Sequence, residues 1–353
     1  MAKSFVNESH PLYAGQYSGI ISSTLETKKQ VESHDVVLHI GPFPVSGNTG
    51  GFSNDMSEDK VIKLHTDYCS IGNKVWKGLD FRPVVAKLVK QLTAKPLGRK
   101  NTLTITKPSS QVSKTLRPPT SQSNPSQAQD IPVDDSCTDA LDHKRFWSRL
   151  SKYLQPGDCV IAEVGTSQYA SLDLRLPDDC QYFSQLYFSC IGFTVPATLG
   201  VLLARKEMNH KGRVILLVGD GSLQMTVQEI GTIIREGLTP TIFVVNNAGY
   251  TIERLIHGPM QQYNDISTQW DYQKMLGFFG GDELKSRSYA AKTYAELGKV
   301  LNDAEFQKSE CIQVLEVYFD VMDSPWNLTD LLNLKNKRLA EAAAAKAKAN
   351  GSK

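Results

Sequence analysis

Two uninterrupted apolar runs, separated by an amphipathic stretch, constrain the fold of this chain more than any other feature. Residues 214–218 and 241–245 show no alternation of apolar and polar side chains, so both are predicted to be strands buried on both faces of a parallel sheet. Between them, apolar residues recur at helical spacing over 223–234, and Gly237 and Pro240 mark the end of that helix. The pattern predicts a βαβ unit of an α/β domain.

Oxygen-bearing side chains follow both predicted strands. Asp220 follows the first, within Gly-Asp-Gly-Ser, and Asn247 follows the second. The carboxyl ends of neighbouring parallel strands meet at one sheet edge, where such sheets bind ligands. These two side chains and a backbone carbonyl at Gly249 suit Mg²⁺, while the N–H groups of Gly221 and Ser222, opening a helix, suit a phosphate. The alternative is an ordinary strand–helix turn in which Asp and Ser cap the helix.

The wider stretch resembles the thiamine-diphosphate enzymes, and within them pyruvate decarboxylase of the eukaryotic type. The resemblance rests on GDGSLQMTVQEI and on NNAGYTIERLIHGPMQQYNDI. It implies that Asp220, Asn247 and the carbonyl of Gly249 bind the metal. It also implies that Glu253 acts on the substrate and on protonation. Ala248 departs from the family, which usually has Asp or another polar residue there.

The same resemblance assigns the other cofactor contacts. Thr166 matches a threonine that contacts the diphosphate, Ile191 matches the apolar side chain that props the cofactor in its bent form, and the carbonyl of Ser189 matches one that receives a pyrimidine amino hydrogen. Composition alone would favour a buried helix over 184–200. The full set of cofactor-binding residues expected is Thr166, Ser189, Cys190, Ile191, Asp220, Gly221, Ser222, Asn247, Ala248, Gly249, Tyr250, Thr251 and Ile252.

The fold class expected is α/β, with two doubly wound parallel-sheet domains. The first, residues 1–94, resembles the family's middle domain, truncated at its start, through GPFPVSGNTGGFS at 41–53. Within it, 35–41 is predicted to be a buried strand, 60–65 a second strand and 82–93 a helix.

The rest of the chain divides by composition. Residues 95–137, rich in Pro, Ser, Thr and Gln, are predicted to be a linker. Residues 138–335 form the expected diphosphate- and Mg²⁺-binding domain, and 336–353 an Ala/Lys-rich helical tail.

Composition bounds the partners and the compartment. The net charge is +2 across 353 residues, without a basic block, so neither a nucleic acid nor a membrane partner is indicated. The six cysteines form no CxxC pair and no zinc spacing, which favours reduced thiols and a cytoplasmic location.

The resemblance implies non-oxidative decarboxylation of a 2-oxo acid to an aldehyde and CO₂, with thiamine diphosphate and Mg²⁺ as cofactors. Pyruvate is the favoured substrate, with indolepyruvate or phenylpyruvate as the alternative. The family's amino-terminal domain, which carries a glutamate that binds the pyrimidine, has no counterpart in this sequence. We therefore expect a homo-oligomer, or a hetero-oligomer with chains that carry that domain. The remaining alternatives are a non-catalytic cofactor-binding partner and a gene fragment.

Overall fold

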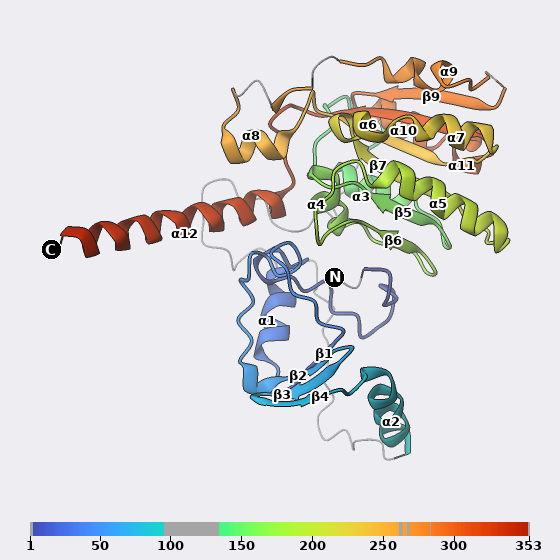
Figure 1. The fold of residues 1–353 in the computed structure, drawn as a ribbon. Coiled ribbons are helices and arrows are strands. Elements are labelled where there is room, and N and C mark those ends of the chain that lie inside the picture. The colour runs from blue at the N-terminus through green and yellow to red at the C-terminus, as the bar shows by residue number, and fades with distance from the viewer. Residues whose placement is uncertain (1–2, 95–133, 261–263, 267–268, 283, 352–353) are drawn as a thin grey trace. The chain divides into compact units, whose positions relative to one another are not determined.

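The computed structural model describes residues 3–94, 134–260, 264–266, 269–282 and 284–351, which fall into two compact units (Figure 1). Most of the predicted linker, 95–133, lies outside the described residues. The expectation of two α/β domains is confirmed. In the described part of the chain, no helix combines the length and the apolar character that crossing a bilayer requires.

The second unit is built on a six-stranded sheet with the order β6-β5-β7-β8-β10-β9, in which every pair of neighbours is parallel. Its strands are β5 (Cys159–Ala162), β6 (Gln181–Phe183), β7 (Val214–Gly219), β8 (Thr241–Asn246), β9 (Ser286–Ala291) and β10 (Ile312–Tyr318). The two apolar runs of the sequence are the central strands β7 and β8, and their apolar side chains are fully or almost fully buried, as predicted.

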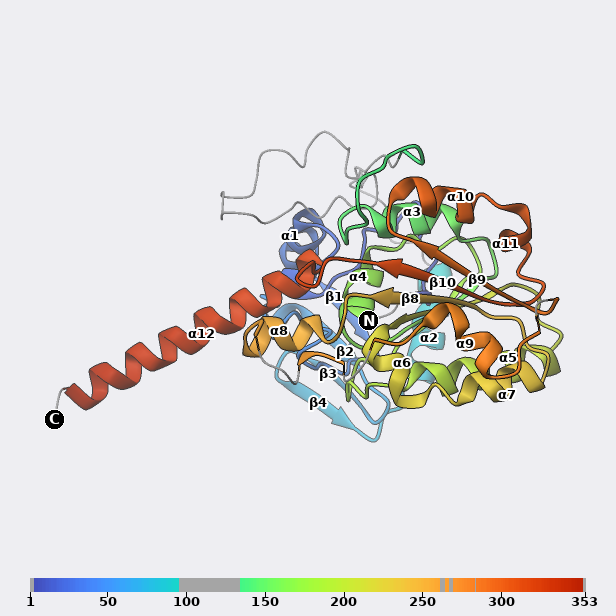
Figure 2. The same cartoon turned by 90° about the horizontal axis from the view of Figure 1, so that it is seen from above.

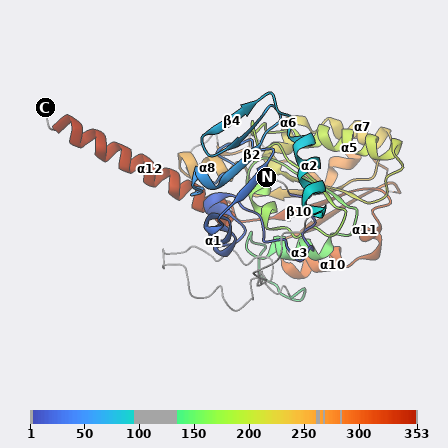
Figure 3. The same ribbon diagram turned by 90° about the horizontal axis from the view of Figure 1, so that it is seen from below.

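Helices cover both faces of this sheet, so it is doubly wound. Alternate side chains of β7 enter two different cores: Ile215 and Leu217 pack with α3 and α10, and Leu216 and Val218 pack with α5 and α7. Figures 2 and 3 show these helix pairs on opposite sides of the strands. The helices of this unit are α3 (Phe146–Tyr153), α4 (Thr166–Ala170), α5 (Thr194–Glu207), α6 (Asp220–Thr226), α7 (Glu229–Arg235), α8 (Thr251–His257), α9 (Met275–Phe278), α10 (Tyr294–Leu301), α11 (Ala304–Lys308) and α12 (Trp326–Gly351), with short 3₁₀ turns η5 (Ser171–Asp173) and η7 (Tyr272–Lys274). The helix predicted over 223–234 is two helices, α6 and α7.

The first unit carries a mixed four-stranded sheet, β1-β2-β3-β4. β1 and β2 are parallel, whereas β3 and β4 are added antiparallel, so this sheet departs from the all-parallel expectation. β1 was expected to be buried, but its side chains alternate between half-buried and exposed because it is an edge strand with one neighbour. The elements of this unit are η1 (Gly19–Ile21), α1 (Leu25–Ser33), β1 (Val37–Ile40), η2 (Glu58–Lys60), β2 (Val61–Leu64), β3 (Tyr68–Ile71), β4 (Lys74–Lys77) and α2 (Phe81–Ala94).

The first residues of the chain pack with the second unit. Residues 3–13 cluster with that unit, whereas the first unit begins at Ala14. The buried Lys3 ammonium donates to the Leu174 carbonyl at 2.7 Å and pairs with Glu8 at 3.1 Å. The Ser4 hydroxyl accepts the backbone N–H of Tyr182, the central residue of β6, at 3.0 Å.

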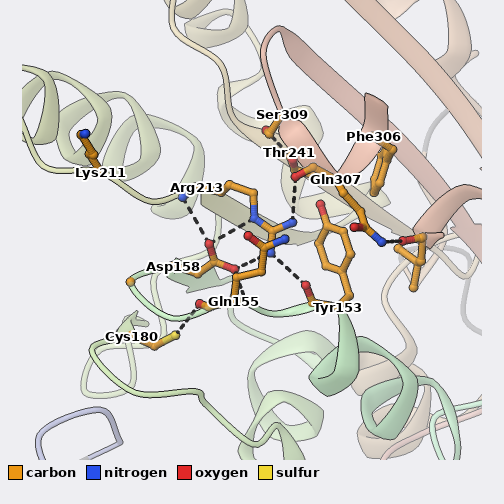
Figure 4. Close-up of polar contacts among 12 residues, drawn as sticks. Tyr153, Gln155, Asp158, Cys180, Lys211, Arg213, Thr241, Phe306, Gln307 and Ser309 are labelled. Atoms are coloured by element: carbon orange, nitrogen blue, oxygen red, sulfur yellow. Dashed lines mark hydrogen bonds and ion pairs between the residues drawn. The ribbon is translucent and has the colours of Figure 1, made fainter. Parts of the chain in front are cut away.

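A buried ion pair joins the amino-terminal ends of the strands, at the edge opposite the polar strand ends (Figure 4). Arg213, just before β7, donates through Nε to Asp158, just before β5, at 3.1 Å and through Nη2 at 2.5 Å. The same guanidinium donates to the carbonyl of Tyr153 at 2.9 Å and lies 4.3 Å from the centre of its ring. One side chain thus holds α3 and two strands together.

His143 is a buried histidine held in one tautomer. Its Nδ1 accepts from Trp147 Nε1 at 3.1 Å, and its ring stacks on Phe319 with 4.6 Å between ring centres. Burial lowers the pKa of His143 to about 3, well below its usual value, and the neighbouring Asp142 charge opposes this only weakly. The imidazole of the folded chain is therefore neutral at neutral pH and in mild acid.

We expect this histidine to reduce stability in mild acid. The unfolded chain binds a proton near pH 6.5 and the folded chain does not, so stability is full above that pH and falls toward the folded pKa. At pH 5 the loss is about 2 kcal/mol. In the variant His143→Gln, the difference between the unfolding free energies at pH 7 and pH 5 should shrink by that amount, measured by urea unfolding.

The aspartates in this unit whose pKa is raised contribute the opposite slope. Burial raises the pKa of Asp173 and of Asp323 to about 6 and that of Asp220 to about 7, so these groups stabilise the fold as the pH falls through those values. All three are present in the two proteins compared, so their contribution cancels. Equal pH slopes for the two proteins would contradict the role given to His143.

Candidate functional site

The polar residues that the sequence singled out meet at the carboxyl edge of the second sheet. β7 and β8 are neighbours in register, with Gly219 opposite Val245, so the segments that follow them leave the sheet side by side. One begins with Asp220, the first residue of α6, and the other is the loop of Asn247, Ala248 and Gly249.

Asp220 joins the two segments. Its carboxylate is buried and accepts the N–H of Gly221 at 2.9 Å through Oδ1 and the N–H of Gly249 at 3.0 Å through Oδ2. Burial raises the pKa of this carboxyl to about 7, and the two backbone N–H groups and the Arg254 charge counteract that rise. Such a carboxylate, buried with no cation bonded to it among the described residues, is typical of a site that receives one.

Asn247 supplies the observation that bears most directly on a metal. Its Oδ1 is buried and has no hydrogen-bond partner among the described residues. A buried amide oxygen without a partner costs free energy, so natural proteins rarely leave one unsatisfied unless a ligand or an ion completes it. Carboxylate, amide and carbonyl oxygens are the donors that Mg²⁺ prefers. The residues present therefore fit the ion.

The loop geometry explains the glycine at position 249. Gly249 has φ = +137°, and a Cβ there would lie 2.5 Å from the carbonyl oxygen of Asn264. Ala248, where the family usually has a polar residue, adopts φ = +58°. Its carbonyl accepts from Arg254 Nη2 at 2.7 Å, and that guanidinium also pairs with Asp265. The strained loop is thus held from α8.

The expected diphosphate side is also closely packed. Tyr250 lies against Gly221, where a Cβ would come within 2.6 Å of the ring, and its hydroxyl donates to the Gly221 carbonyl at 3.3 Å. Ser222 is buried in the first turn of α6. Thr251 stays an expected cofactor contact; its hydroxyl donates to the carbonyl of Val321 at 2.8 Å, which anchors the start of α8. Ile252 follows it in the same helix.

Glu253 lies in the first turn of α8. Its side chain is 39% exposed, and His257 Nε2, one helical turn later, lies 3.3 Å from its carboxylate. The carboxylate is therefore open to solvent in this chain.

Thr166 opens α4 directly after β5 and is buried, at the same sheet edge as Asp220. Gly165 before it has φ = +112°, a conformation that favours glycine. The fully buried Glu163 accepts from the hydroxyl of Thr194 at 2.6 Å and from its backbone N–H at 3.1 Å. This residue, which the sequence did not single out, fixes the start of α5 against the end of β5.

The segment of Ser189, Cys190 and Ile191 is a turn. The helix that composition favoured over 184–200 begins only at Thr194, because Ser189 and Gly192 both have positive φ and interrupt it. The Gly192 carbonyl accepts from Thr226 at the end of α6 at 2.8 Å, so this turn lies beside the helix that follows Asp220. Ser189, Cys190 and Ile191 carry exposed side chains.

In the described part of the chain, no three His, Cys, Asp or Glu side chains form a metal-binding group. The ligand set expected here contains a single carboxylate, so it is not a cluster of this kind.

Comparison with known proteins identifies the family. Residues 163–317 match the thiamine pyrophosphate enzyme C-terminal TPP binding domain, and residues 1–92 match the central domain of the same enzymes. The chain belongs to the thiamine pyrophosphate enzymes. The edge built by Asp220 and Asn247 lies within the matched TPP binding domain.

The curated relatives of this thiamine pyrophosphate enzyme chain include pyruvate decarboxylases of yeasts. It is 38% identical over 336 residues to pyruvate decarboxylase of Candida glabrata, covering 95% of this chain and 55% of the relative. It is 37% identical over 334 residues to pyruvate decarboxylase isozyme 1 of Saccharomyces cerevisiae, again covering 95% and 55%. The chain therefore spans about half the length of the curated relatives it matches.

Solved structures show the same fold. Benzoylformate decarboxylase of Polynucleobacter necessarius superposes with a TM-score of 0.57 at 17% identity, covering 90% of this chain and 55% of that one. A thiamin diphosphate-dependent enzyme of Mycobacterium smegmatis gives 0.54 at 19% identity, covering 88% and 53%.

Proposed function

We propose that this chain binds thiamine diphosphate with Mg²⁺ and takes part in the non-oxidative decarboxylation of a 2-oxo acid, with pyruvate as the favoured substrate. The observation that carries the proposal is the buried Asn247 Oδ1, which has no hydrogen-bond partner among the described residues and belongs to the loop whose Gly249 N–H bonds to the Asp220 carboxylate. Both residues lie in a domain whose relatives are named pyruvate decarboxylases.

The residues of this chain would have the following roles in binding the metal and the cofactor. Asp220, Asn247 and the Gly249 carbonyl would bind the metal, and the N–H groups of Gly221 and Ser222 would contact the diphosphate. Thr166, Tyr250, and the turn of Ser189, Cys190 and Ile191 would complete the cofactor site. The bound cofactor supplies the electron sink that is needed when CO₂ leaves.

Glu253 would hold and deliver a proton through its carboxyl group. It lies in the first turn of α8, which follows the loop 247–249, and His257 lies one helical turn later.

We also propose that the site is completed by a second chain in a homo-oligomer or hetero-oligomer. Two large apolar side chains of this unit are exposed: Phe188 is 80% exposed, and Met260, just after α8, is 90% exposed. Exposed apolar side chains of this size are common at interfaces between chains. The free state of the described cysteines agrees with a reducing, cytoplasmic location.

A single substitution separates binding from chemistry. We expect Glu253→Gln to bind thiamine diphosphate as tightly as the parent chain, followed by tryptophan quenching, because Glu253 lies outside the proposed ligand set. Acetaldehyde release from pyruvate should fall by about 10²–10⁴-fold, the usual contribution of a general acid or base.

Each outcome has a distinct meaning. Equal turnover by the two proteins would remove Glu253 from the reaction. Binding without turnover by either would mean that the chain supplies a cofactor site and another chain supplies the rest. Absence of cofactor binding by the parent chain would contradict the proposed function.

A further inference from the structure

A buried carboxylate on the neighbouring strand contacts the metal loop indirectly. Glu316 of β10 is buried and accepts two side-chain amide donors, Asn246 Nδ2 at 2.7 Å and Gln273 Nε2 at 2.9 Å. It pairs with no Lys, Arg or His among the described residues. Its role is therefore to accept hydrogen bonds rather than to neutralise a charge.

Asn246 links Glu316 to the metal loop through two hydrogen bonds. Its Nδ2 is committed to Glu316, so its Oδ1 faces the other way and accepts the backbone N–H of Ala248 at 3.1 Å. Ala248 has φ = +58°, a conformation that a residue with a side chain rarely adopts unless its surroundings impose it. The two neighbours of Ala248 are Asn247 and Gly249, the proposed metal ligands of this loop.

The turn that carries Gln273 also reaches the other strand end. The hydroxyl of the adjacent Tyr272, fully buried in η7, donates to the backbone carbonyl of Asp220 at 3.0 Å. One short turn thus supports the start of α6 through Tyr272 and the loop after β8 through Gln273 and Glu316.

We propose that Glu316 is a positioning residue for the metal site: together with Asn246 and Gln273 it forms a brace that holds the loop 247–249 in the conformation that presents two metal ligands. The expected effect on metal binding rests on the proposed function, whereas the hydrogen bonds of the brace are independent of it. The brace fixes the loop conformation in the metal-free chain. The free energy needed to hold Ala248 at positive φ is therefore supplied by folding and does not reduce the free energy of metal binding.

The donors and acceptors of the brace predict which substitution removes a hydrogen bond and which second substitution restores it. Glu316→Gln keeps the shape but places an NH₂ group opposite one of two NH₂ donors, so one hydrogen bond becomes a repulsive contact. Asn246 cannot compensate by turning its amide, because its NH₂ would then face the N–H of Ala248. The double variant N246D/E316Q reverses the polarity: the introduced aspartate accepts from Ala248 and from the introduced amide, whose oxygen still accepts from Gln273.

The first measurement is amide hydrogen exchange in the metal-free chain. We expect E316Q to speed exchange at Ala248 and Gly249 by about 10-fold, and the double variant to return both rates to near those of the parent. Gln313→Leu is the matched control. Gln313 lies on the same strand as Glu316, at the end far from the loop. Its replacement removes buried hydrogen bonds to the Thr241 hydroxyl and to the Phe306 carbonyl. It should lower stability without changing exchange in the loop.

The second measurement is Mn²⁺ affinity at saturating thiamine diphosphate, from the free-ion signal in electron paramagnetic resonance. E316Q should raise the dissociation constant about 10-fold, the lower end of the 10- to 100-fold loss seen when residues that orient metal ligands are removed, because Glu316 acts through Asn246; the double variant should restore it. Unchanged loop exchange in E316Q, or no repair by the double variant, would overturn the brace. If the parent chain binds no Mn²⁺, the proposed function is wrong, while the exchange measurement still decides whether Glu316 holds the loop.

Discussion

Asp220→Asn is expected to abolish Mg²⁺-dependent binding of thiamine diphosphate, with an affinity at least about 100-fold lower. Removing a partner of a metal ligand usually costs 10- to 100-fold in affinity, and Asp220 is the only carboxylate in the proposed ligand set. The substitution also places an NH₂ group against the N–H of Gly221 or of Gly249, both of which Asp220 now accepts. One of these two hydrogen bonds would be lost together with the negative charge of Asp220.

The measurement is a titration of thiamine diphosphate at fixed Mg²⁺, followed by tryptophan quenching. Asp179→Asn is the matched control, since it makes the same change of charge at an exposed position where φ = +59° is tolerated by Asn as by Asp. It should bind as the parent does. Tight binding by the Asp220 variant would exclude the proposed metal site.

Asp158→Asn is expected to destabilise the second unit by about 3–5 kcal/mol, the usual cost of leaving one partner of a buried ion pair alone. The two side chains are among the most buried ionised groups described, at 1% exposed for Asp158 and 8% for Arg213. Asp158 also accepts the backbone N–H of Gln155 at 2.8 Å and that of Arg213 at 3.2 Å, so the change disturbs two chain segments at once. The cofactor edge, at the other end of the strands, keeps all its contacts.

Chemical unfolding followed by circular dichroism measures this loss. The comparison is Asp271→Asn, which breaks a pair with Lys274 that lies in solvent and should leave stability unchanged within error. A similar, small effect of both substitutions would mean that the buried pair contributes no more than a surface pair. Cofactor affinity at a temperature where both variants are folded should match the parent.

Much of the site was predictable because it is local in sequence. The strands β7 and β8, the turn after each, and the assignment of Asp220 and Asn247 to one edge follow from apolar periodicity and from the rule that parallel strands end together.

Other features depended on neighbours that are distant along the chain. The exposure of β1 follows from its place at a sheet edge, which its apolar composition did not reveal. The delayed start of α5 comes from positive φ angles at Ser189 and Gly192 within a sequence whose composition suits a helix.

The sequence by itself determined the βαβ unit and the chemical types of its edge residues, because periodicity and turn residues act over a few positions. Tertiary structure alone decided what each side chain faces. Glu316 meets Asn246 from 70 residues away, and Lys3 meets Leu174 from 171 residues away. Such contacts depend on strand order and on closing long loops, which no local pattern encodes. The unpartnered oxygen of Asn247 is visible for the same reason only in the folded chain.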